Sequence, residues 1–313
     1  MFRTNKSPLK TLKLISLDKY LVEMIDLYES NCFPKVLLLN GKKGIGKFTL
    51  IFHFLNYIYT KQDKNSYDLT EKLVNINSNF YKSILNQTCN DVVFFQAEEG
   101  MNIKIHDVRN LKSVLSRSSL SANPRFTIID EVEFLNVNSA NALLKTLEEP
   151  SVNNYFILIN NQQTDLIDTI SSRCIKHYIH LNADQQNKVI DYFIKNKILD
   201  TSIINLNDLT PGLLLKYTEL CIKYKIKNND NILLNLNKLL NAYKKDKDKS
   251  LINLLVFFIN QFFYYQTKRN INKIDILLNI KFTIIHKIND FIVYNLNIRS
   301  VLDSIELTLK NVR

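Results

Sequence analysis

The chain has 313 residues, a length that predicts two or three compact units rather than one small domain. Hydrophobic residues make up 46% of it, with only 5 glycines and 5 prolines, which excludes a fibrous or largely disordered protein. The formal net charge of +11 is compatible with an anionic partner such as nucleic acid, but the lysine, asparagine and isoleucine bias of an AT-rich genome would raise the charge without selecting a surface.

Short apolar runs alternate with helical patterns through the first part of the chain. These runs predict strands of a parallel sheet, because strands covered on both faces are continuously apolar. We expect strands at 36–39, 92–95, 126–129, 155–159 and 175–181. We expect helices from the end of a glycine loop to about Tyr59, over 107–120, and over 138–149, where Pro150 stops the last one.

After about residue 182 the strand signals cease. Helices are expected at 185–198 and 211–223, which together have the size of a small lid, and the polar stretch 225–230 is expected to be a linker. From Ile232 onward, apolar residues recur at helical spacing, which predicts an all-helical C-terminal domain. The fold class is therefore α/β, with a parallel-sheet part followed by helical parts.

A phosphate-binding loop is indicated between the first strand and the helix after it. The segment from Gly41 to Lys47, which also contains Gly44 and Gly46, matches the front of the P-loop pattern GxxxxGK. Glycines let backbone amides turn toward phosphate oxygens, and the helix N-terminus and the lysine add positive charge. The next residue should carry a hydroxyl for magnesium, but it is Phe48, and Thr49 comes one place late, about 100° around the helix. The loop predicts a site for the phosphates of ATP, with Mg²⁺ poorly held.

The third expected strand ends in two carboxylates, Asp130 and Glu131. In P-loop proteins such a Walker B pair holds magnesium through water and polarises the attacking water. A strand that ends in acidic residues is common by itself, so only the P-loop upstream makes this pair informative. We expect Asp130 to contribute to the nucleotide site and Glu131 to be its catalytic candidate.

The stretch from Asn141 to Pro150 reads NALLKTLEEP, and after one more strand Arg173 lies in an SRC sequence. These motifs, at this spacing, closely resemble the bacterial clamp-loader ATPase family over roughly residues 8–220. The C-terminal part resembles it only in length and helical character. The resemblance implies an AAA+ RecA-like domain at 1–182, a helical lid at 183–225, and a helical collar domain for oligomerisation at 226–313.

In that family, the SRC arginine lies at a subunit boundary and reaches the neighbour's nucleotide as an arginine finger. Arg173 is the matching residue, and a rigid, always charged guanidinium suits a γ-phosphate. The alternative is an arginine that serves a surface or structural ion pair. The family also has a polar sensor residue at the end of the fourth strand, where this chain has Asn160 and Asn161. An amide there could contact the γ-phosphate or cap the strand, and the sequence does not separate these roles.

The family contains a motor type (gamma or tau), which hydrolyses ATP, and a delta-prime type, which generally does not. Phe48 removes the hydroxyl that a motor needs, and Leu213 stands where the family's lid arginine would touch nucleotide. Motors carry a four-cysteine zinc module before the Walker B strand, whereas only Cys89 lies there, so no zinc is expected. Glu131 is retained, as in motors. The balance favours the delta-prime type, with Arg173 donated in trans, over a catalytic gamma/tau-type ATPase.

A subunit of this type is expected within the DNA polymerase III holoenzyme, as part of a hetero-oligomer. Its expected partners are the gamma/tau and delta subunits, the sliding clamp and primer-template DNA. Its own ATPase activity is expected to be weak or absent. A further alternative is a stand-alone nucleic-acid-binding protein that has kept an AAA+ shell.

The remaining signals concern the cellular setting. The four cysteines form no CxxC pair, so reduced thiols and no metal site are expected. The N-terminal stretch has no sustained apolar run, which argues against a signal peptide. The most hydrophobic segment, Leu251 to Tyr265, is too short to span a bilayer. A cytoplasmic protein without membrane contact is expected.

Overall fold

The computed structural model describes residues 11–96, 103–115, 123–199, 209–227 and 231–310. Within these, the chain forms two compact units. The first comprises 11–198 and 209–213, and the second comprises Leu199 and 214–310. The expected domains at 1–182, 183–225 and 226–313 stay a prediction, because compactness alone does not identify a lid or a collar.

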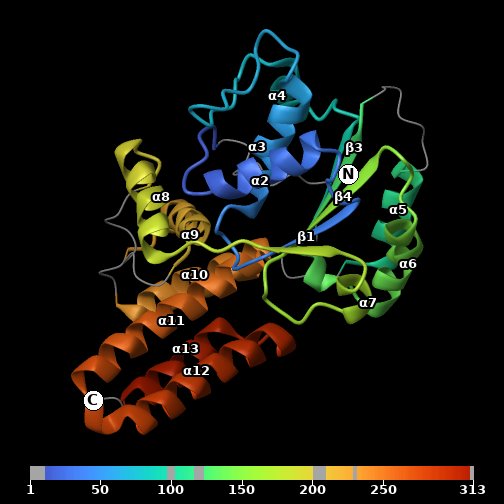
Figure 1. Ribbon diagram of the computed structural model, residues 1–313. Helices are drawn as coiled ribbons and strands as arrows, with labels where there is room; N and C mark the ends of the chain where they lie inside the picture. Colours follow the sequence, from blue (N-terminus) through green and yellow to red (C-terminus); the bar gives the residue numbers. More distant parts are fainter. Residues whose placement is uncertain (1–10, 97–102, 116–122, 200–208, 228–230, 311–313) are drawn as a thin grey trace. The chain divides into compact units, whose positions relative to one another are not determined.

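A five-stranded parallel sheet forms the centre of the first unit, in the order β2-β3-β4-β1-β5 (Figure 1). The strands are β1 (Val36–Asn40), β2 (Val92–Gln96), β3 (Arg125–Asp130), β4 (Asn154–Asn160) and β5 (Ile175–Tyr178). In register, Leu37 of β1 lies between Ile157 of β4 and Ile175 of β5. The expected α/β class with a parallel sheet is confirmed.

Both faces of the sheet are buried, and this explains the continuous apolar runs of its strands. In β1, Leu37 and Leu39 pack into one core, whereas Val36 and Leu38 pack into the other. The first core is covered by α2 (Asp18–Glu29), α3 (Lys47–Thr60) and α4 (Asn79–Leu85), and the second by α5 (Ile105–Leu115), α6 (Val137–Glu148) and α7 (Asp168–Ser171) (Figure 1).

The structure differs from the expected boundaries at several places. β5 ends at Tyr178 rather than at 181, although the amide of Ile179 still donates to the carbonyl of Asn40. The helix expected over 107–120 begins at Ile105 and is described to Leu115, and 116–122 lie outside the described residues. α8 (Ala183–Lys195) begins earlier than 185 because Asn182 forms a capping box with Gln185.

The second unit is helical, as expected. Its helices are α9 (Pro211–Tyr224, from Leu214 onward), α10 (Ile232–Asp246), α11 (Lys249–Arg269), α12 (Ile274–Tyr294) and α13 (Ile298–Lys310). α10 packs on α11, α11 on α12, and α12 on α13. α13 also packs on α10. Of the expected linker, 228–230 lie outside the described residues. Among the described helices, none is long and apolar enough to cross a membrane.

Candidate functional site

Three glycines shape the loop between β1 and α3. Gly44 and Gly46 have φ values of 83° and 96°, a left-handed conformation that glycine adopts at little cost. At Gly41, a Cβ atom would lie 2.4 Å from the carbonyl oxygen of Ile179. The backbone therefore requires glycine at all three of these loop positions, and such a turn aims backbone amides at an anion.

Lys47 is the first residue of α3, and its side chain is buried, with 3% of its surface exposed. Its Nζ donates to the carbonyl oxygens of Gly41 at 2.5 Å and of Lys42 at 2.8 Å. Burial lowers the pKa of Lys47 to about 8, against the raising effect of Asp130 and Glu133. An ammonium held at a helix N-terminus beside a glycine turn is a donor set that fits phosphate oxygens.

The position after the lysine belongs to the core instead of a metal site. The ring of Phe48 is half-buried and lies 5.3 Å from the ring of Phe94 on β2, centroid to centroid. Thr49, also half-buried, is displaced around the helix by one residue. The loop therefore fits phosphate groups but lacks the hydroxyl that a catalytic magnesium requires. Among the described residues, no group of three or more His, Cys, Asp or Glu side chains is arranged to hold a metal ion.

Asp130 is the last residue of β3 and lies at the carboxyl end of the sheet. One of its oxygens, Oδ1, accepts hydrogen bonds from the backbone amide of Glu131 at 2.8 Å and from Nδ2 of Asn161 at 3.1 Å. Burial and the neighbouring charge of Glu131 raise the pKa of Asp130 to about 6. The structure thus brings together Asp130 and Asn161, two of the residues that the sequence singled out.

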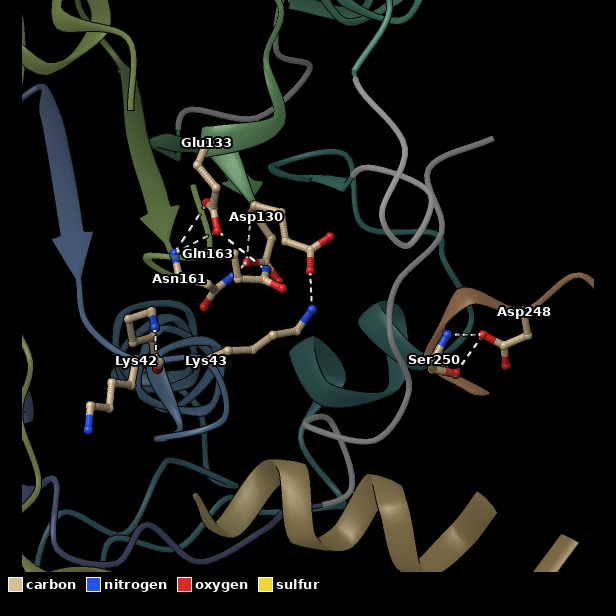
Figure 2. Close-up of polar contacts among 10 residues, drawn as sticks. Lys42, Lys43, Asp130, Glu133, Asn161, Gln163, Asp248 and Ser250 are labelled. Atoms are coloured by element: carbon tan, nitrogen blue, oxygen red, sulfur yellow. Dashed lines mark hydrogen bonds and ion pairs between the residues drawn. The ribbon is translucent and has the colours of Figure 1, made fainter. Parts of the chain in front are cut away.

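Glu131 is paired with the phosphate loop itself. It adopts a positive φ of 57° and is 1% exposed, and Nζ of Lys43 lies 2.5 Å from its Oε1. Figure 2 shows the Lys43 side chain extended from the loop toward the end of β3. The second oxygen, Oε2, is buried without a hydrogen-bond partner in the described chain. Sequence reasoning missed Lys43, because it occupies a variable position of the GxxxxGK pattern.

The two asparagines at the end of β4 have different surroundings. Nδ2 of Asn160 donates to Oδ1 of Asn40 at 2.9 Å and so joins β4 to β1. Asn161 directs its amide to Asp130, and its backbone amide donates to the carboxylate of Glu133 at 3.1 and 3.2 Å (Figure 2). Glu133 is buried and was not anticipated from the sequence, because no motif marks it.

The segment 209–213 packs directly on the phosphate loop. Oγ1 of Thr210 donates to the carbonyl oxygen of Lys43 at 2.6 Å. The backbone amide of Gly212 donates to the carbonyl oxygen of Gly44 at 2.8 Å. Leu213 follows, half-buried. The segment thus supports the loop through the Thr210 side chain and the Gly212 amide. At the position where the family's lid arginine would touch nucleotide, Leu213 brings no charge.

Arg173 lies apart from these residues. It precedes β5, whose first residue, Ile175, pairs with Leu37 of β1, whereas the phosphate loop follows the last residue of β1, Asn40. Parallel strands begin at one edge of a sheet and end at the other, at about 3.3 Å per residue, so roughly 15–20 Å separate Arg173 from the loop. The Arg173 side chain is 31% exposed. It is therefore a surface residue at the opposite edge of the sheet from the other predicted site residues.

A family model described as "DNA polymerase III, delta subunit" matches residues 18–184, more than half of the chain. The chain belongs to this family. The finding confirms the resemblance carried by the NALLKTLEEP and SRC motifs. Among the curated relatives that match are proteins named DNA polymerase III subunit delta′, which agrees with the delta-prime type of clamp-loader subunit.

The relatives match only part of the chain. The delta′ subunit of Pseudomonas aeruginosa is 30% identical over 140 residues, 44% of this chain and 41% of the relative. The gamma subunit of Buchnera aphidicola is 28% identical over 173 residues, 55% and 46% respectively, and the delta′ subunit of Bacillus subtilis is 37% identical over 76 residues, 24% and 23%. The chain thus spans less than half the length of each of these curated relatives.

Solved structures also match. A DNA polymerase III gamma subunit-related protein from Thermotoga maritima is 17% identical, with a TM-score of 0.44 over 98% of this chain and 100% of that one. The RuvB Holliday junction branch migration motor of the same organism is 15% identical, with a TM-score of 0.42 over 76% of this chain and 80% of that one.

Proposed function

We propose that this member of the DNA polymerase III delta-subunit family acts as a delta-prime-type clamp-loader subunit that donates Arg173 to the ATP site of a neighbouring subunit. The position of Arg173 carries the proposal. Because roughly the length of a strand separates it from the phosphate loop of its own chain, its guanidinium cannot reach a nucleotide held there. An arginine that is 31% exposed at that end of the sheet is better placed for a site on another molecule than for the loop of its own chain.

The state of the chain's own pocket supports a weak or absent ATPase activity. Phe48 packs against Phe94 where a magnesium-binding hydroxyl would be needed. Lys43 holds Glu131, the candidate for polarising the attacking water, in a close ion pair. Gly41, Gly44, Gly46 and Lys47 remain suited to the phosphates of ATP, so the pocket is proposed to hold nucleotide as a structural ligand and not to hydrolyse it.

A surface on α12 supports assembly with other subunits. One side of this helix, which includes Leu277 and Ile284, is buried in its own bundle. A second side exposes Ile274, Leu278 and Phe282, spaced by four residues and therefore in a row along the helix, and Phe282 is 63% exposed. An apolar row outside the core is suited to packing against another protein. We assign this surface to the gamma/tau and delta subunits in the proposed hetero-oligomer.

The sliding clamp and primer-template DNA are the remaining partners proposed for this chain. The net charge of +11 supports a polyanionic partner, because a positive field attracts the phosphate backbone. This support is general, and it assigns no particular lysine to DNA.

The test is reconstitution of the full-length chain with the gamma/tau and delta subunits of the same organism. Arg173→Ala is expected to lower ATP turnover while the complex still assembles, as measured by size-exclusion chromatography. Arg173→Lys should also stay impaired, because lysine keeps the charge but lacks the planar fork. Unchanged turnover with Arg173→Ala would contradict the proposal.

The alternatives give different results with the isolated chain. A gamma/tau-type ATPase would show magnesium-dependent ATP turnover that Lys47→Ala abolishes. A stand-alone nucleic-acid-binding protein would bind DNA strongly, lose that binding as salt rises, and form no stable complex with gamma/tau. The proposal expects neither behaviour.

A further inference from the structure

The guanidinium of Arg173 is held on two sides. Its Nε and Nη2 lie 2.6 and 2.5 Å from Oε1 of Glu148, the last residue of α6, and its Nη1 donates to the carbonyl oxygen of Thr169 on α7 at 2.8 Å. A longer contact of 3.4 Å joins Nη1 to Oγ of Ser172. α6 and α7 pack on the same core, so the two main acceptors keep a fixed relation to each other.

These contacts leave the phosphate-binding part of the guanidinium available. The group has five N–H donors. Glu148 takes Nε–H and one N–H of Nη2, and Thr169 takes one N–H of Nη1. One N–H of Nη2 therefore remains without a partner, and the second N–H of Nη1 has only the 3.4 Å contact with Oγ of Ser172. A phosphate group that takes the Nη2 donor and replaces this weak Ser172 contact would complete a two-oxygen contact. The Glu148 and Thr169 acceptors fix the direction of the side chain without consuming these two donors.

The place of Glu148 on its helix does not account for the residue. A carboxylate in the last turn faces the negative end of the helix macrodipole, which is unfavourable at an exposed position. Glu148 is such a residue, at the C-terminal end of α6 and 46% exposed on its side chain. Arg173 compensates the charge of Glu148. The ion pair with Arg173, and not the helix, therefore accounts for a carboxylate at this position.

We propose that Glu148 is a positioning residue for Arg173: it preorients the guanidinium toward the neighbouring subunit's γ-phosphate. This inference rests on the proposed function of Arg173. An arginine side chain loses rotamer freedom when it is fixed, and Glu148 imposes this order before the subunits meet. The Arg173 guanidinium is then already aligned when the transition state of ATP hydrolysis forms in the neighbouring subunit.

The test uses the reconstituted complex described above. The quantity of interest is the Arg173-dependent share of ATP turnover, defined as the difference between the wild-type and Arg173→Ala complexes. Glu148→Ala is expected to lower this share about tenfold or more, since a small misplacement of a catalytic group can cost up to about a hundredfold. The loss should appear in kcat with an unchanged KM for ATP, because the finger acts in the transition state.

Two further variants separate positioning from a structural effect. Glu148→Gln keeps an acceptor oxygen that binds a guanidinium more weakly, so it should give an intermediate turnover. Glu149→Gln, at the adjacent exposed residue, is the matched control and should behave as wild type. The double variant Glu148→Ala/Arg173→Ala should equal Arg173→Ala alone, because the two residues act as one unit.

The outcomes distinguish failure of this inference from failure of the proposed function. If Arg173→Ala has no effect, the proposed function fails and this inference fails with it. If Arg173→Ala lowers turnover but both Glu148 variants match wild type, only the positioning role is overturned. A rise in turnover with Glu148→Ala would also overturn it, because the carboxylate would then restrain the finger. If Glu148→Ala disrupts assembly, Glu148→Gln decides, and an intermediate turnover from an intact complex supports the role.

Discussion

The ammonium of Lys43 lies 2.5 Å from Oε1 of Glu131, so the phosphate loop supplies the partner of its own Walker B glutamate. Glu131 is almost fully buried, and a buried carboxylate without a counter-ion is costly. The carbonyl oxygen of Lys43 also accepts from Thr210. This arrangement gives a structural use to a glutamate that the motor type uses for catalysis, so the retention of Glu131 is compatible with the weak or absent ATPase activity proposed for this chain.

The first prediction concerns the stability contributed by this pair. Lys43→Met should lower the free energy of unfolding by about 3 kcal/mol, because it leaves Glu131 buried and unpaired. Adding Glu131→Gln should restore most of the loss, because an amide needs no counter-ion. Urea denaturation of the full-length chain measures both effects, with Lys42→Met, at the exposed neighbouring residue, as the control. Equal midpoints for the Lys43 and Lys42 variants would show that the ion pair contributes little.

Most of the fold could be predicted from the sequence, because its strands are apolar on both faces. The runs at 36–39, 92–95, 126–129 and 155–159 mark β1 to β4 to within one residue at each end. The exception is β5, an edge strand whose sequence IKHY mixes polar and apolar residues. α4 was not anticipated, because its seven residues are too few to show a clear helical period. α2, with 12 residues, was missed although its buried Leu21, Met24 and Ile25 recur at helical spacing.

The candidate site was only partly predictable. Glycine spacing and terminal carboxylates mark the loop and the end of β3, because these features depend on residues close together in the chain. The pairs Lys43–Glu131 and Glu148–Arg173 join residues 88 and 25 positions apart, and lysine or glutamate at such positions is ordinary surface composition. Only the three-dimensional arrangement shows that they meet.

A second prediction tests the packing of segment 209–213 on the phosphate loop. Gly44→Ala should be clearly more destabilising than Gly46→Ala, although both positions have positive φ. A Cβ on Gly44 would lie 2.4 Å from Oγ1 of Thr210 and 2.8 Å from the backbone nitrogen of Leu213, whereas one on Gly46 would lie 3.0 Å from the flexible end of Leu17. Alanine at either position costs about 1–2 kcal/mol because of the positive φ. The additional destabilisation of Gly44→Ala over Gly46→Ala in thermal unfolding therefore measures the clash with segment 209–213. Equal losses would mean that the segment can move aside.

A third prediction concerns acid sensitivity in the first core. His53 is fully buried between the Tyr67 hydroxyl at 2.9 Å from Nδ1 and the carbonyl oxygen of Thr11 at 3.1 Å from Nε2. Burial lowers the pKa of His53 from 6.5 to about 4. The unfolded chain therefore binds the proton more readily between these values. The stability contributed is complete above pH 6.5 and is lost as the pH falls toward 4, by up to about 3 kcal/mol.

The measurement is urea denaturation of wild type and His53→Gln between pH 7 and pH 4.5. The glutamine variant should be less stable at pH 7, since its fit to both partners is poorer, but the difference from wild type should shrink as the pH falls. His106→Gln, on an exposed part of α5, is the control for replacing a histidine outside the core. A constant difference between wild type and His53→Gln would contradict a lowered pKa.

The last prediction separates the two asparagines that the sequence left undecided. Asn160 is the structural one, because its side chain donates to Asn40 and accepts from the amide of Gln162 at 2.9 Å, and both groups would lose that hydrogen bond in Asn160→Ala. Asn161→Ala removes one hydrogen bond to Oδ1 of Asp130, but this oxygen still accepts a hydrogen bond from the backbone amide of Glu131. At roughly 1–3 kcal/mol for each buried group left unsatisfied, Asn160→Ala should be the more destabilising variant in urea denaturation. Conversely, only Asn161→Ala should weaken ATP binding by the isolated chain, since its amide binds Asp130, whose charge acts on Lys47 of the proposed phosphate site. The opposite assignment would require Asn160→Ala to weaken ATP binding while stability is unchanged.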